Sequence, residues 1–419
     1  MVCRTGEGIA VLPRRGAGRW LTMGASPPVV RCGLDVTWLR RIVVFVVFGC
    51  VTLAVWLACP RAAVAAHWSL EHAVAPAHMN DSDFFAVSCV SRSACTAVGD
   101  LVNGAGTGLT LAERWNGVGW SIQRTPNRVI DSGLLGGFED VSCKSPSQCI
   151  ATGSADALPL AAQWKGVGWA SQRTPEAPAG GDLQGVSCPS VTLCVAAGWL
   201  ISGATLTEHW DGVSWLIQQT PRPVGAKDST LQDISCASIT ACTAVGYYTS
   251  RTGNEWTLAE HWDGVSWSIQ QTPQRAGAKD SDLFRISCAS ITACTAVGYY
   301  TARTHKDRML AERWDGVSWS IERTPQPTGA RDSDLFGISC TTATVCTAVG
   351  SFTNRAGTTV PFAEHWNGTR WSIQRTPRPV GATDSDLRGI SCTRATVCTA
   401  VGSFTNRADT TMPLAQRYT

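Results

Sequence analysis

Glutamate recurs two residues before a tryptophan along this chain of 419 residues, and we assign glutamine to the same position in two further segments. The positions are Glu113, Glu208, Glu260, Glu312 and Glu364, with Gln163 and Gln416. Such carboxyl groups could form a ring of general acids. The alternative is structural, because buried polar groups accept internal hydrogen bonds. Since the position belongs to the tryptophan-bearing face of its strand, we favour the structural role and predict no catalytic residue.

A second oxygen-rich pattern, Asp-Ser-Asp, occurs at residues 81–83, 280–282, 332–334 and 384–386. Carboxylate oxygens at this spacing could bind calcium, but the longer Asp-rich loop that ends in a bidentate acid is absent from the sequence. Asp and Ser side chains also close turns by bonding to nearby backbone. We therefore expect turns here, and we predict neither a metal site nor a cofactor.

A third group consists of residues that interrupt an otherwise regular repeat. Aromatic rings beside arginine, lysine and aspartate are typical of sugar or peptide sites, because they combine contact area with directed hydrogen bonds. Ordinary exposed loops can have the same composition. The candidate ligand-binding residues are Trp199, Tyr247, Tyr248, Arg251, Trp256, Tyr299, Tyr300, Arg303, His305, Lys306, Asp307 and Arg308.

The regular element of the repeat is a pair of cysteines separated by five residues. The pairs are Cys89 with Cys95, Cys143 with Cys149, Cys188 with Cys194, Cys236 with Cys242, Cys288 with Cys294, Cys340 with Cys346, and Cys392 with Cys398. Even, regular cysteines in an exported chain predict disulfides, whereas zinc sites use closer spacing. Each bridge would close a loop of roughly seven residues, worth about 2 kcal/mol. We expect each disulfide to link the two strands of one hairpin at its loop.

One unit, residues 231–282, contains four segments with strand character. Residues 231–236 and 242–248 form the hairpin that carries the cysteines, and residues 258–262 and 265–269 flank Asp263-Gly264. Asp-Gly between alternating segments predicts a two-residue type I′ turn. That turn would place Val265 opposite Trp262, with both tryptophans of the hairpin on one face.

Four strands in each unit of about fifty residues, repeated seven times, predict an all-β, seven-bladed β-propeller of four-stranded antiparallel blades. The last unit stops at residues 414–419, before its fourth strand. Residues 68–72 align with Trp371–Arg375 and so supply a strand of the missing type. We therefore predict a ring closed by the N-terminal strand, which joins the last blade.

The N-terminal 65 residues have the layout of a leader. An apolar run at residues 42–58 follows Arg40-Arg41 and precedes small residues, which predicts a secretory signal cleaved after Ala65. An uncleaved membrane anchor is the alternative, because seventeen apolar residues are near the minimum for a bilayer span. The predicted organisation is thus residues 1–65 as extension and signal peptide or anchor, and residues 66–419 as the propeller. The expected location is extracellular, with membrane contact only if the leader stays uncleaved.

Charge excludes one class of partner. The whole chain has 35 basic and 32 acidic side chains, of which 8 and 2 lie in residues 1–65, leaving 27 and 30 in the remainder. Nucleic-acid binding needs a basic face. The slightly acidic propeller therefore predicts no nucleic-acid partner, and we expect a monomer.

The two faces of the propeller differ in sequence. The cysteine loops and Asp-Gly turns fall on one face and hardly vary, whereas the connections on the other face vary in length and composition. Because binding residues are disproportionately found on loops of a rigid scaffold, we place the candidate ligand-binding residues on the variable face.

The repeat also resembles known repeats. Its motifs, illustrated by one unit, are Ile286-Ser287-Cys288, Cys294-Thr295-Ala296-Val297-Gly298, residues 310–320 and Thr324-Pro325. These motifs are similar to repeats of exported, mostly uncharacterised actinobacterial proteins, and more broadly to galactose-oxidase/kelch-like and sialidase-type propellers. The resemblance covers residues 66–419. Kelch repeats have Gly-Gly where this chain has Ala-Val-Gly, and Asp-box repeats place a residue between Asp and Gly, so no catalytic residue carries over.

Three functions remain open. A secreted, non-catalytic binding or scaffold module for a glycan or cell-wall polymer is favoured, because the near-identical later units suit repeated equivalent sites. A carbohydrate-active hydrolase or lyase with an acid and a base from different units is the second interpretation. Adhesion to another surface protein is the third, since fold alone does not define function.

Overall fold

The computed structural model describes residues 66–77, 79–126, 136–175 and 180–419, all within the unit Val64–Thr419. The predicted signal peptide or anchor, residues 1–65, lies outside these residues. The described part of the chain is built from β-strands and contains no α-helix. Accordingly, no helix among these residues is long and apolar enough to cross a membrane.

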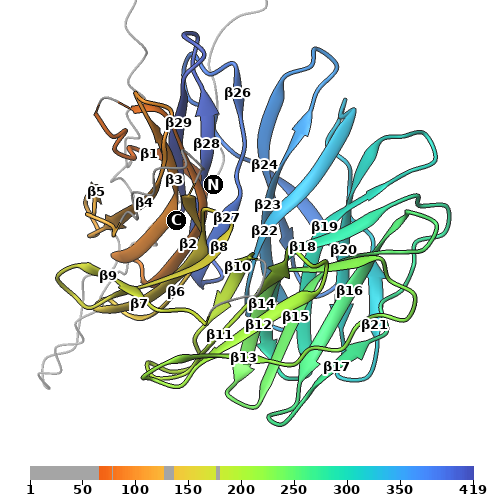
Figure 1. Cartoon of the computed structure of the whole chain (residues 1–419). Helices are drawn as coiled ribbons and strands as arrows, with labels where there is room; N and C mark the ends of the chain where they lie inside the picture. The colour runs from red at the N-terminus through yellow and green to blue at the C-terminus, as the bar shows by residue number, and fades with distance from the viewer. Residues whose placement is uncertain (1–65, 78, 127–135, 176–179) are drawn as a thin grey trace, which may run out of the picture. The chain divides into compact units, whose positions relative to one another are not determined.

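The strands form seven antiparallel sheets arranged as the blades of a propeller (Figure 1), as predicted. Blade 1 contains β2 (Met79–Ser91), β3 (Ala94–Asn103), β4 (Gly108–Trp115) and β5 (Trp120–Ile122); blade 2 contains β6 (Gly136–Ser145), β7 (Gln148–Ala155), β8 (Leu158–Trp164) and β9 (Trp169–Gln172). Blade 3 contains β10 (Gly181–Ser187), β11 (Cys194–Leu200), β12 (Thr205–Trp210) and β13 (Trp215–Gln218); blade 4 contains β14 (Asp228–Ser238), β15 (Ala241–Thr249), β16 (Glu255–Trp262) and β17 (Trp267–Gln270). Blade 5 contains β18 (Ser281–Ser290), β19 (Ala293–Thr301), β20 (Asp307–Trp314) and β21 (Trp319–Glu322); blade 6 contains β22 (Asp332–Thr342), β23 (Val345–Thr353), β24 (Thr359–Trp366) and β25 (Trp371–Arg375).

Blade 7 is assembled from both ends of the propeller. Its inner strand is divided into β26 (Asp384–Ser385) and β27 (Gly389–Arg394), followed by β28 (Val397–Thr405) and β29 (Thr411–Tyr418). The N-terminal β1 (Trp68–Glu71) pairs with β29, with Trp68 opposite Tyr418 (Figure 1). The Trp68 indole N–H also donates to Gln374 Oε1 of blade 6 at 2.9 Å. The predicted closure of the ring by the N-terminal strand is confirmed.

A closed circle of hydrogen bonds links the seven inner hairpins. The backbone N–H of the first cysteine in each blade donates to the hydroxyl of the serine that precedes the first cysteine in the blade before. The circle closes where Cys89 of blade 1 donates to Ser391 of blade 7 at 3.0 Å. Because all seven distances are 2.9–3.0 Å, the same contact fixes the spacing at every blade interface.

The seven predicted disulfides are all present, each between strands of one blade. The cysteines of each pair have Cα atoms 3.9–4.0 Å apart. In six blades the two residues are direct partners across the first two strands, as Cys236 and Cys242 are in blade 4. Each bridge is therefore local to its hairpin. Seven disulfides fit a protein of an oxidising, extracellular compartment.

The bridges are largely buried, although each lies beside the loop of its hairpin. The second cysteine of every pair is buried, with at most 3% of its surface exposed: Cys95, Cys149, Cys194, Cys242, Cys294, Cys346 and Cys398. The reason is that the second strand packs on a neighbouring blade, so that Cys95 Sγ lies 3.6 Å from the Thr399 hydroxyl of blade 7. These residues are thus closed to any ligand, and their role is structural.

The predicted two-residue turn is wrong. Trp262 pairs with Trp267, so Asp263, Gly264, Val265 and Ser266 all belong to the turn. The Asp263 carboxylate accepts the backbone N–H groups of Val265 and Ser266, both at 2.8 Å, and only the glycine adopts a positive φ of 98°. Val265 is consequently 84% exposed and does not join the tryptophan face. A type I′ turn would have needed positive φ at both central residues.

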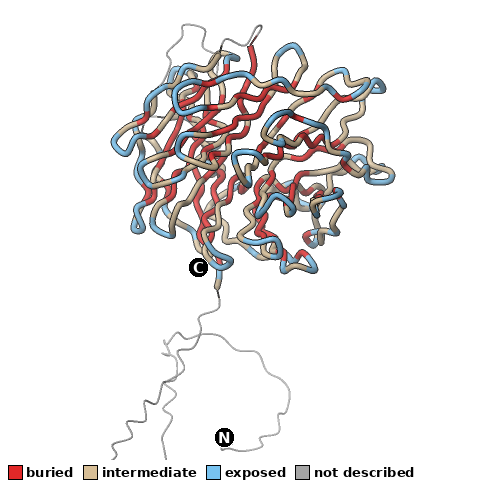
Figure 2. Tube along the Cα trace, turned by 90° about the horizontal axis from the view of Figure 1, so that it is seen from below, coloured by how far each residue is buried: buried red, intermediate tan, exposed pale blue. Residues whose placement is uncertain are grey.

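Each blade packs its face on the next, and the buried residues follow the strands while exposed residues gather in the loops (Figure 2). At the interface of blades 3 and 4, for example, Val195 and Ala197 contact Leu231, Ala244 and Leu258. Neither surface could be covered within one blade, because a single four-stranded sheet has nothing on its apolar face.

An arginine bridges the inner strands near the centre of the ring. Arg285 of blade 5 donates to the carbonyl oxygens of Glu139, Gln184 and Gln232 in blades 2, 3 and 4, at 3.1–3.3 Å. Beside it, the buried carboxylates of Asp140 and Asp233 interact electrostatically with the guanidinium and each accepts a backbone N–H from the following blade at 2.8 Å. One side chain thus joins four of the seven blades, and the sequence offered no sign of this role.

Candidate functional site

The recurring glutamates are buried rather than presented to a substrate. Glu113, Glu208, Glu260, Glu312 and Glu364 have no exposed surface. Burial raises the pKa of Glu113 to about 7 and those of the other four to about 8. The four acids with a pKa of about 8 are therefore mostly protonated at neutral pH.

Glutamine at the same position shows which contact a neutral side chain makes there. The Gln416 amide donates to the carbonyl oxygen of Pro377 in the preceding blade at 2.9 Å. The protonated glutamates can donate in the same way. In blade 1 the preceding segment has Val74 in place of proline, and the Val74 N–H donates to Glu113 at 3.1 Å. The position serves blade packing, consistent with the favoured structural interpretation.

The assignment of Gln163 to this position is wrong. Ala162 is the residue paired with Ala151, as Glu260 is paired with Ala244 in blade 4. Because side chains alternate along a strand, Gln163 lies on the opposite face of β8 and is directed towards blade 3. Gln163 directly precedes Trp164, whereas each recurring glutamate lies two residues before its tryptophan.

The first aspartate of each Asp-Ser-Asp triplet bonds to the backbone of the preceding blade. Asp280, Asp332, Asp384 and Asp81 accept the N–H of Glu255, Asp307, Thr359 and Thr411, at 2.7–3.1 Å. These are the N–H groups at or near the start of each third strand. The triplet therefore contributes to the contact between blades, which is a longer-range role than the local turn that we predicted.

Three of the predicted ligand-binding residues share one position in consecutive blades. Trp199, Tyr247 and Tyr299 lie in the second strands of blades 3, 4 and 5. Their partners in the first strands are Asp182, Thr230 and Asp282, respectively. The other blades have Asp100, Ser154, Ser351 and Ser403 there. The structure thus brings these three aromatics to one side of the ring, on the face of the variable connections.

Acidic groups accompany the two tyrosines. Burial raises the pKa of Asp282, which pairs with Tyr299, to about 8. Burial also raises the pKa of Tyr247 and that of Tyr299, and Asp282 and Glu255 act on both phenols in the same direction. The ring of Phe284 lies 5.3 Å from that of Tyr299 and 5.6 Å from Phe336. This inner cluster is aromatic and acidic.

The remaining predicted residues mostly hold the connections themselves. Arg308 donates to the carbonyl oxygen of Arg331 at 2.6 Å, and the His305 ring lies 3.0 Å from Lys279 Nζ. The Tyr300 ring is covered by the guanidinium of Arg275 at 4.5 Å. Arg251 and Arg303 lie against glycines of the connections that enter blades 4 and 5, Asp307 accepts the Thr301 hydroxyl, and Tyr248 pairs with Trp256. These residues belong to the strands of blades 4 and 5 and to the loops between those strands.

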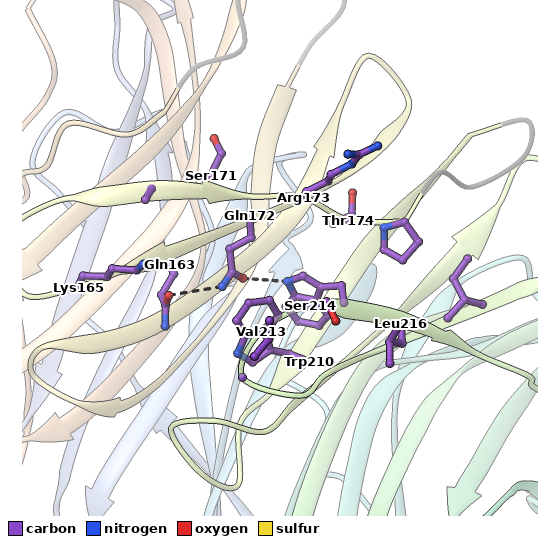
Figure 3. A pocket seen from close by; sticks show the side chains of 15 residues that line it. Gln163, Lys165, Ser171, Gln172, Arg173, Thr174, Trp210, Val213, Ser214 and Leu216 are labelled. Atoms are coloured by element: carbon purple, nitrogen blue, oxygen red, sulfur yellow. Dashed lines mark hydrogen bonds between the residues drawn. The ribbon is translucent and has the colours of Figure 1, made fainter.

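A cavity lies elsewhere, between the outer strands of blades 2 and 3. It has a volume of about 760 Å³ and is lined by β9, β13 and the turn before β13. The Trp215 indole N–H donates to Gln172 Oε1 at 2.8 Å, and the Gln172 amide donates to Gln163 Oε1 at 3.5 Å. These bonds form a polar line from β8 through β9 to β13 along the cavity (Figure 3). We refer to this cavity as the outer groove.

The outer groove combines hydrogen-bonding groups with apolar surface. Lys165, Arg173, Ser171 and Thr174 surround it from blade 2, and Val213, Ser214 and Leu216 from blade 3 (Figure 3). Val213 is 85% exposed and Leu216 52% exposed. None of the described residues that line the groove is acidic, whereas two are cationic. Its charge is thus opposite to the slight net charge of the propeller.

The same groove recurs between blades 6 and 7. A cavity of about 410 Å³ there is lined by Gln374, Arg375, Thr376 and Pro377, followed by Trp68 of the next blade. Gln172, Arg173, Thr174 and Pro175, followed by Trp215, line the outer groove in the same order. Both cavities are therefore copies of one interface position.

Sequence reasoning missed the outer groove, although the sequence contains a signal. The outer strand of most blades reads Trp-Ser-Ile, but blade 2 has Ala170-Ser171 after its tryptophan and blade 3 has Leu216-Ile217. These are departures from the repeat, like those used to choose the predicted residues. They were overlooked because they are small or aliphatic.

No protein-family model matches this chain, and no curated protein matches it. Among solved structures, U3-55K is similar with a TM-score of 0.54 at 9% identity, covering 84% of this chain and 98% of that one. At this identity the likeness concerns the fold alone. Aleuria aurantia lectin in complex with alpha-methyl-L-fucoside gives a TM-score of 0.42 at 12% identity over 75% of this chain and 97% of the lectin. Trypanosoma rangeli sialidase gives 0.43 at 10% identity over 81% of this chain and 54% of the sialidase.

Proposed function

We propose that the protein is an exported, non-catalytic binding module that holds a glycan or cell-envelope polymer in the outer groove. The observation that carries the proposal is the groove itself, a cavity of about 760 Å³ with planar amides, hydroxyls and cations above apolar side chains. This volume is within the range of about 300–1,000 Å³ that is usual for ligand sites. Sugars offer hydroxyl groups to such polar side chains and C–H surface to apolar ones.

The charge of the groove narrows the class of polymer. Lys165 and Arg173 are exposed at its edge, and no carboxylate opposes them among the described lining residues. Arginine pairs with carboxylate or phosphate through two parallel hydrogen bonds. A polymer that carries such acidic groups is therefore favoured over a neutral one.

The second copy of the groove, between blades 6 and 7, supports a repeating ligand. Two equivalent sites on one molecule raise the effective affinity for a polymer without any new contact. A scaffold with no ligand would gain nothing from either cavity.

Hydrolysis is not favoured at the groove. Most glycoside hydrolases need a pair of carboxyl groups on either side of the scissile bond. No Asp or Glu is among the described residues that line the outer groove. The recurring glutamates cannot supply the pair, because they are fully buried between blades.

The aromatic residues on the variable face remain a predicted contact area. Trp199, Tyr247 and Tyr299 would present rings to a ligand that lies near the centre of that face. Export of the protein, with cleavage after Ala65, also remains part of the proposal. We propose this area as secondary, because its partly buried rings lie beside acidic groups.

The test is a binding screen of the oxidised protein against neutral and acidic polysaccharides and cell-wall polymers. We expect binding to an acidic polymer, and a loss of about 10-fold or more in Lys165→Ala/Arg173→Ala, since charge-assisted hydrogen bonds contribute about 1.5–3 kcal/mol each. Arg323→Ala, at the position of Arg173 in blade 5, is the matched control and should bind normally. If Trp199→Ala and Trp256→Ala abolish binding while the groove variant retains it, the site is on the variable face and the groove proposal is wrong.

A further inference from the structure

In three blades an arginine of the third strand packs on a tryptophan of the next blade. Arg114, Arg313 and Arg417 each precede the final residue of a third strand. Their guanidinium carbons lie 4.5, 4.9 and 4.8 Å from the ring centroids of Trp164, Trp366 and Trp115, respectively. An arginine over an indole ring is the preferred cation–π geometry.

The same guanidinium groups also donate a hydrogen bond to the neighbouring cysteine loop. Arg313 Nη2 donates to the carbonyl oxygen of Ala343 at 3.1 Å, and Arg417 Nη2 to that of Arg92 at 2.7 Å. Arg114 donates to Pro146. In each blade the acceptor is the third residue after the first cysteine. An indole face together with this carbonyl therefore forms a complete guanidinium site, occupied three times by the chain's own side chains.

The interface of blades 3 and 4 has the same site without its arginine. His209 replaces the arginine, opposite Trp262, and Ile239 is the third residue after Cys236. A cavity of about 280 Å³ is present there, lined by His209, Trp262 and Ile239 together with Gln218 and Thr240. We refer to it as the slot. Its volume is below the range of drug-sized ligand sites, so it suits one side chain.

Burial distinguishes the empty slot from the occupied sites. Trp115, Trp164 and Trp366 are only 5–6% exposed beneath their arginines. Trp262, by contrast, is only partly buried. The carboxylate of Asp211, in the turn that follows Trp210, interacts electrostatically with His209 and adds negative charge near the slot.

We infer that the slot binds a guanidinium group, presented by an arginine side chain of a partner protein. The incoming group would stack on Trp262 and donate to the carbonyl of Ile239, as Arg313 does with Trp366 and Ala343. Lysine would bind more weakly, because its ammonium is compact, strongly hydrated and unable to stack as a plane. This site is separate from the outer groove, and its occupant carries the opposite charge from the polymer proposed there.

The experiment titrates the full-length oxidised protein, labelled with ¹⁵N at tryptophan, with an arginine-containing peptide and its lysine counterpart. We expect the arginine peptide to shift the Trp262 indole signal, assigned with Trp262→Phe, and to bind about 10-fold more tightly than the lysine peptide. Guanidinium chloride at millimolar concentration should compete with the arginine peptide, because it offers the same planar cation.

The decisive variant is His209→Arg, which fills the slot with a side chain that the fold already accepts at three interfaces. It should abolish the Trp262 response. His365→Arg makes the same substitution opposite Tyr418 and should leave the response unchanged. Equal binding of the two peptides, or a Trp262 response that persists in His209→Arg, would overturn the inference; the peptide comparison decides it even if the variant does not fold.

Discussion

The inner and outer parts of each blade interface differ in how strictly they repeat. At the inner part, a serine hydroxyl accepts the N–H of the next blade's first cysteine at all seven interfaces. At the outer part, among the residues that the structure describes, a glutamine accepts the next blade's indole N–H at four interfaces, through Gln172, Gln218, Gln270 and Gln374. The inner contacts therefore maintain the ring at every interface, whereas the outer contacts vary. The two grooves lie at interfaces where the glutamine bond is present, so the open space comes from other side chains of the outer part.

The largest effect on stability is expected at the centre of the ring. Arg285→Met removes the cation that acts electrostatically on Asp140 and Asp233 and leaves three part-buried carbonyl oxygens without their donor. An acceptor left without its donor costs about 1–3 kcal/mol, so three of them together make a loss of about 3–5 kcal/mol the expectation. Urea unfolding should show a loss of this size. Arg308→Met at the rim is the control, and a central loss no larger than that of the control would contradict the assigned role.

The next effect is a dependence of stability on pH through the buried glutamates. The folded-state pKa of Glu312 is raised to about 8, so its stabilising contribution is fully present below the unfolded pKa near 4.5 and is lost as the pH rises through 8. Each pH unit in this interval removes up to about 1.4 kcal/mol. Between pH 6 and pH 8 the free energy of unfolding, measured with urea, should therefore fall by about 2–3 kcal/mol more in the wild type than in Glu312→Gln. Equal losses in the two proteins would show that Glu312 is already ionised at pH 6.

A smaller loss of stability is expected when one of the seven disulfides is removed. Cys236→Ser/Cys242→Ser opens a loop of roughly seven residues and should reduce the free energy of unfolding by about 2 kcal/mol. The ring should still close, because six other disulfides and the serine hydroxyls remain. Thermal unfolding with and without the substitution measures the loss. If blade 4 loses its packing in the ring, its strands should give broad signals in NMR spectra. That result would mean that the disulfide does more than link the two strands of one hairpin.

The smallest effect concerns the glutamine–indole hydrogen bond, which is missing between Glu322 of blade 5 and Trp371 of blade 6. Glu322 takes the place of the usual glutamine in blade 5, is 4.0 Å from Arg313, and the Trp371 indole N–H has no partner among the described residues. In Glu322→Gln the uncharged side chain is no longer attracted to Arg313, so its amide oxygen can accept the Trp371 indole N–H as glutamine does at other interfaces, which should stabilise the protein by about 0.5–1 kcal/mol. Arg323→Gln, next to it and exposed, should change nothing. A decrease in the melting temperature of Glu322→Gln would instead show that the Arg313 pair matters more.

Much of the fold could be predicted because its determinants are local. The cysteine spacing predicted the seven hairpins, and the match of residues 68–72 to Trp371–Arg375 predicted the closure. The turn at Asp263-Gly264 could not be settled in this way. Its length depends on whether the Asp263 side chain accepts backbone N–H groups, and Asp-Gly is compatible with both outcomes.

The burial of the sulfur bridges shows the same limit. Spacing along the chain predicted that Cys340 bonds to Cys346 and Cys392 to Cys398. It could not show that Cys346 and Cys398 are each only 1% exposed, because that surface is covered by side chains of the blade as a whole and of its neighbour.

The candidate site was less accessible to sequence reasoning. Trp199, Tyr247 and Tyr299 were correctly recognised as departures from the repeat, and they do occupy one equivalent position. The outer groove was missed because Gln172 and Trp215 belong to different blades. No periodic pattern indicates that the small Ala170 and Ser171 leave an open space between them.

The sequence by itself determined the number of blades, the disulfide pairing and the closure of the ring, because each follows from spacing along the chain. Only the tertiary structure decided that Arg285 joins four blades, that the glutamates are buried with raised pKa values, and that two outer grooves and a slot opposite Trp262 are open. The physical reason is that burial and open volume depend on side chains from two neighbouring blades at once, and repetition describes only one blade at a time.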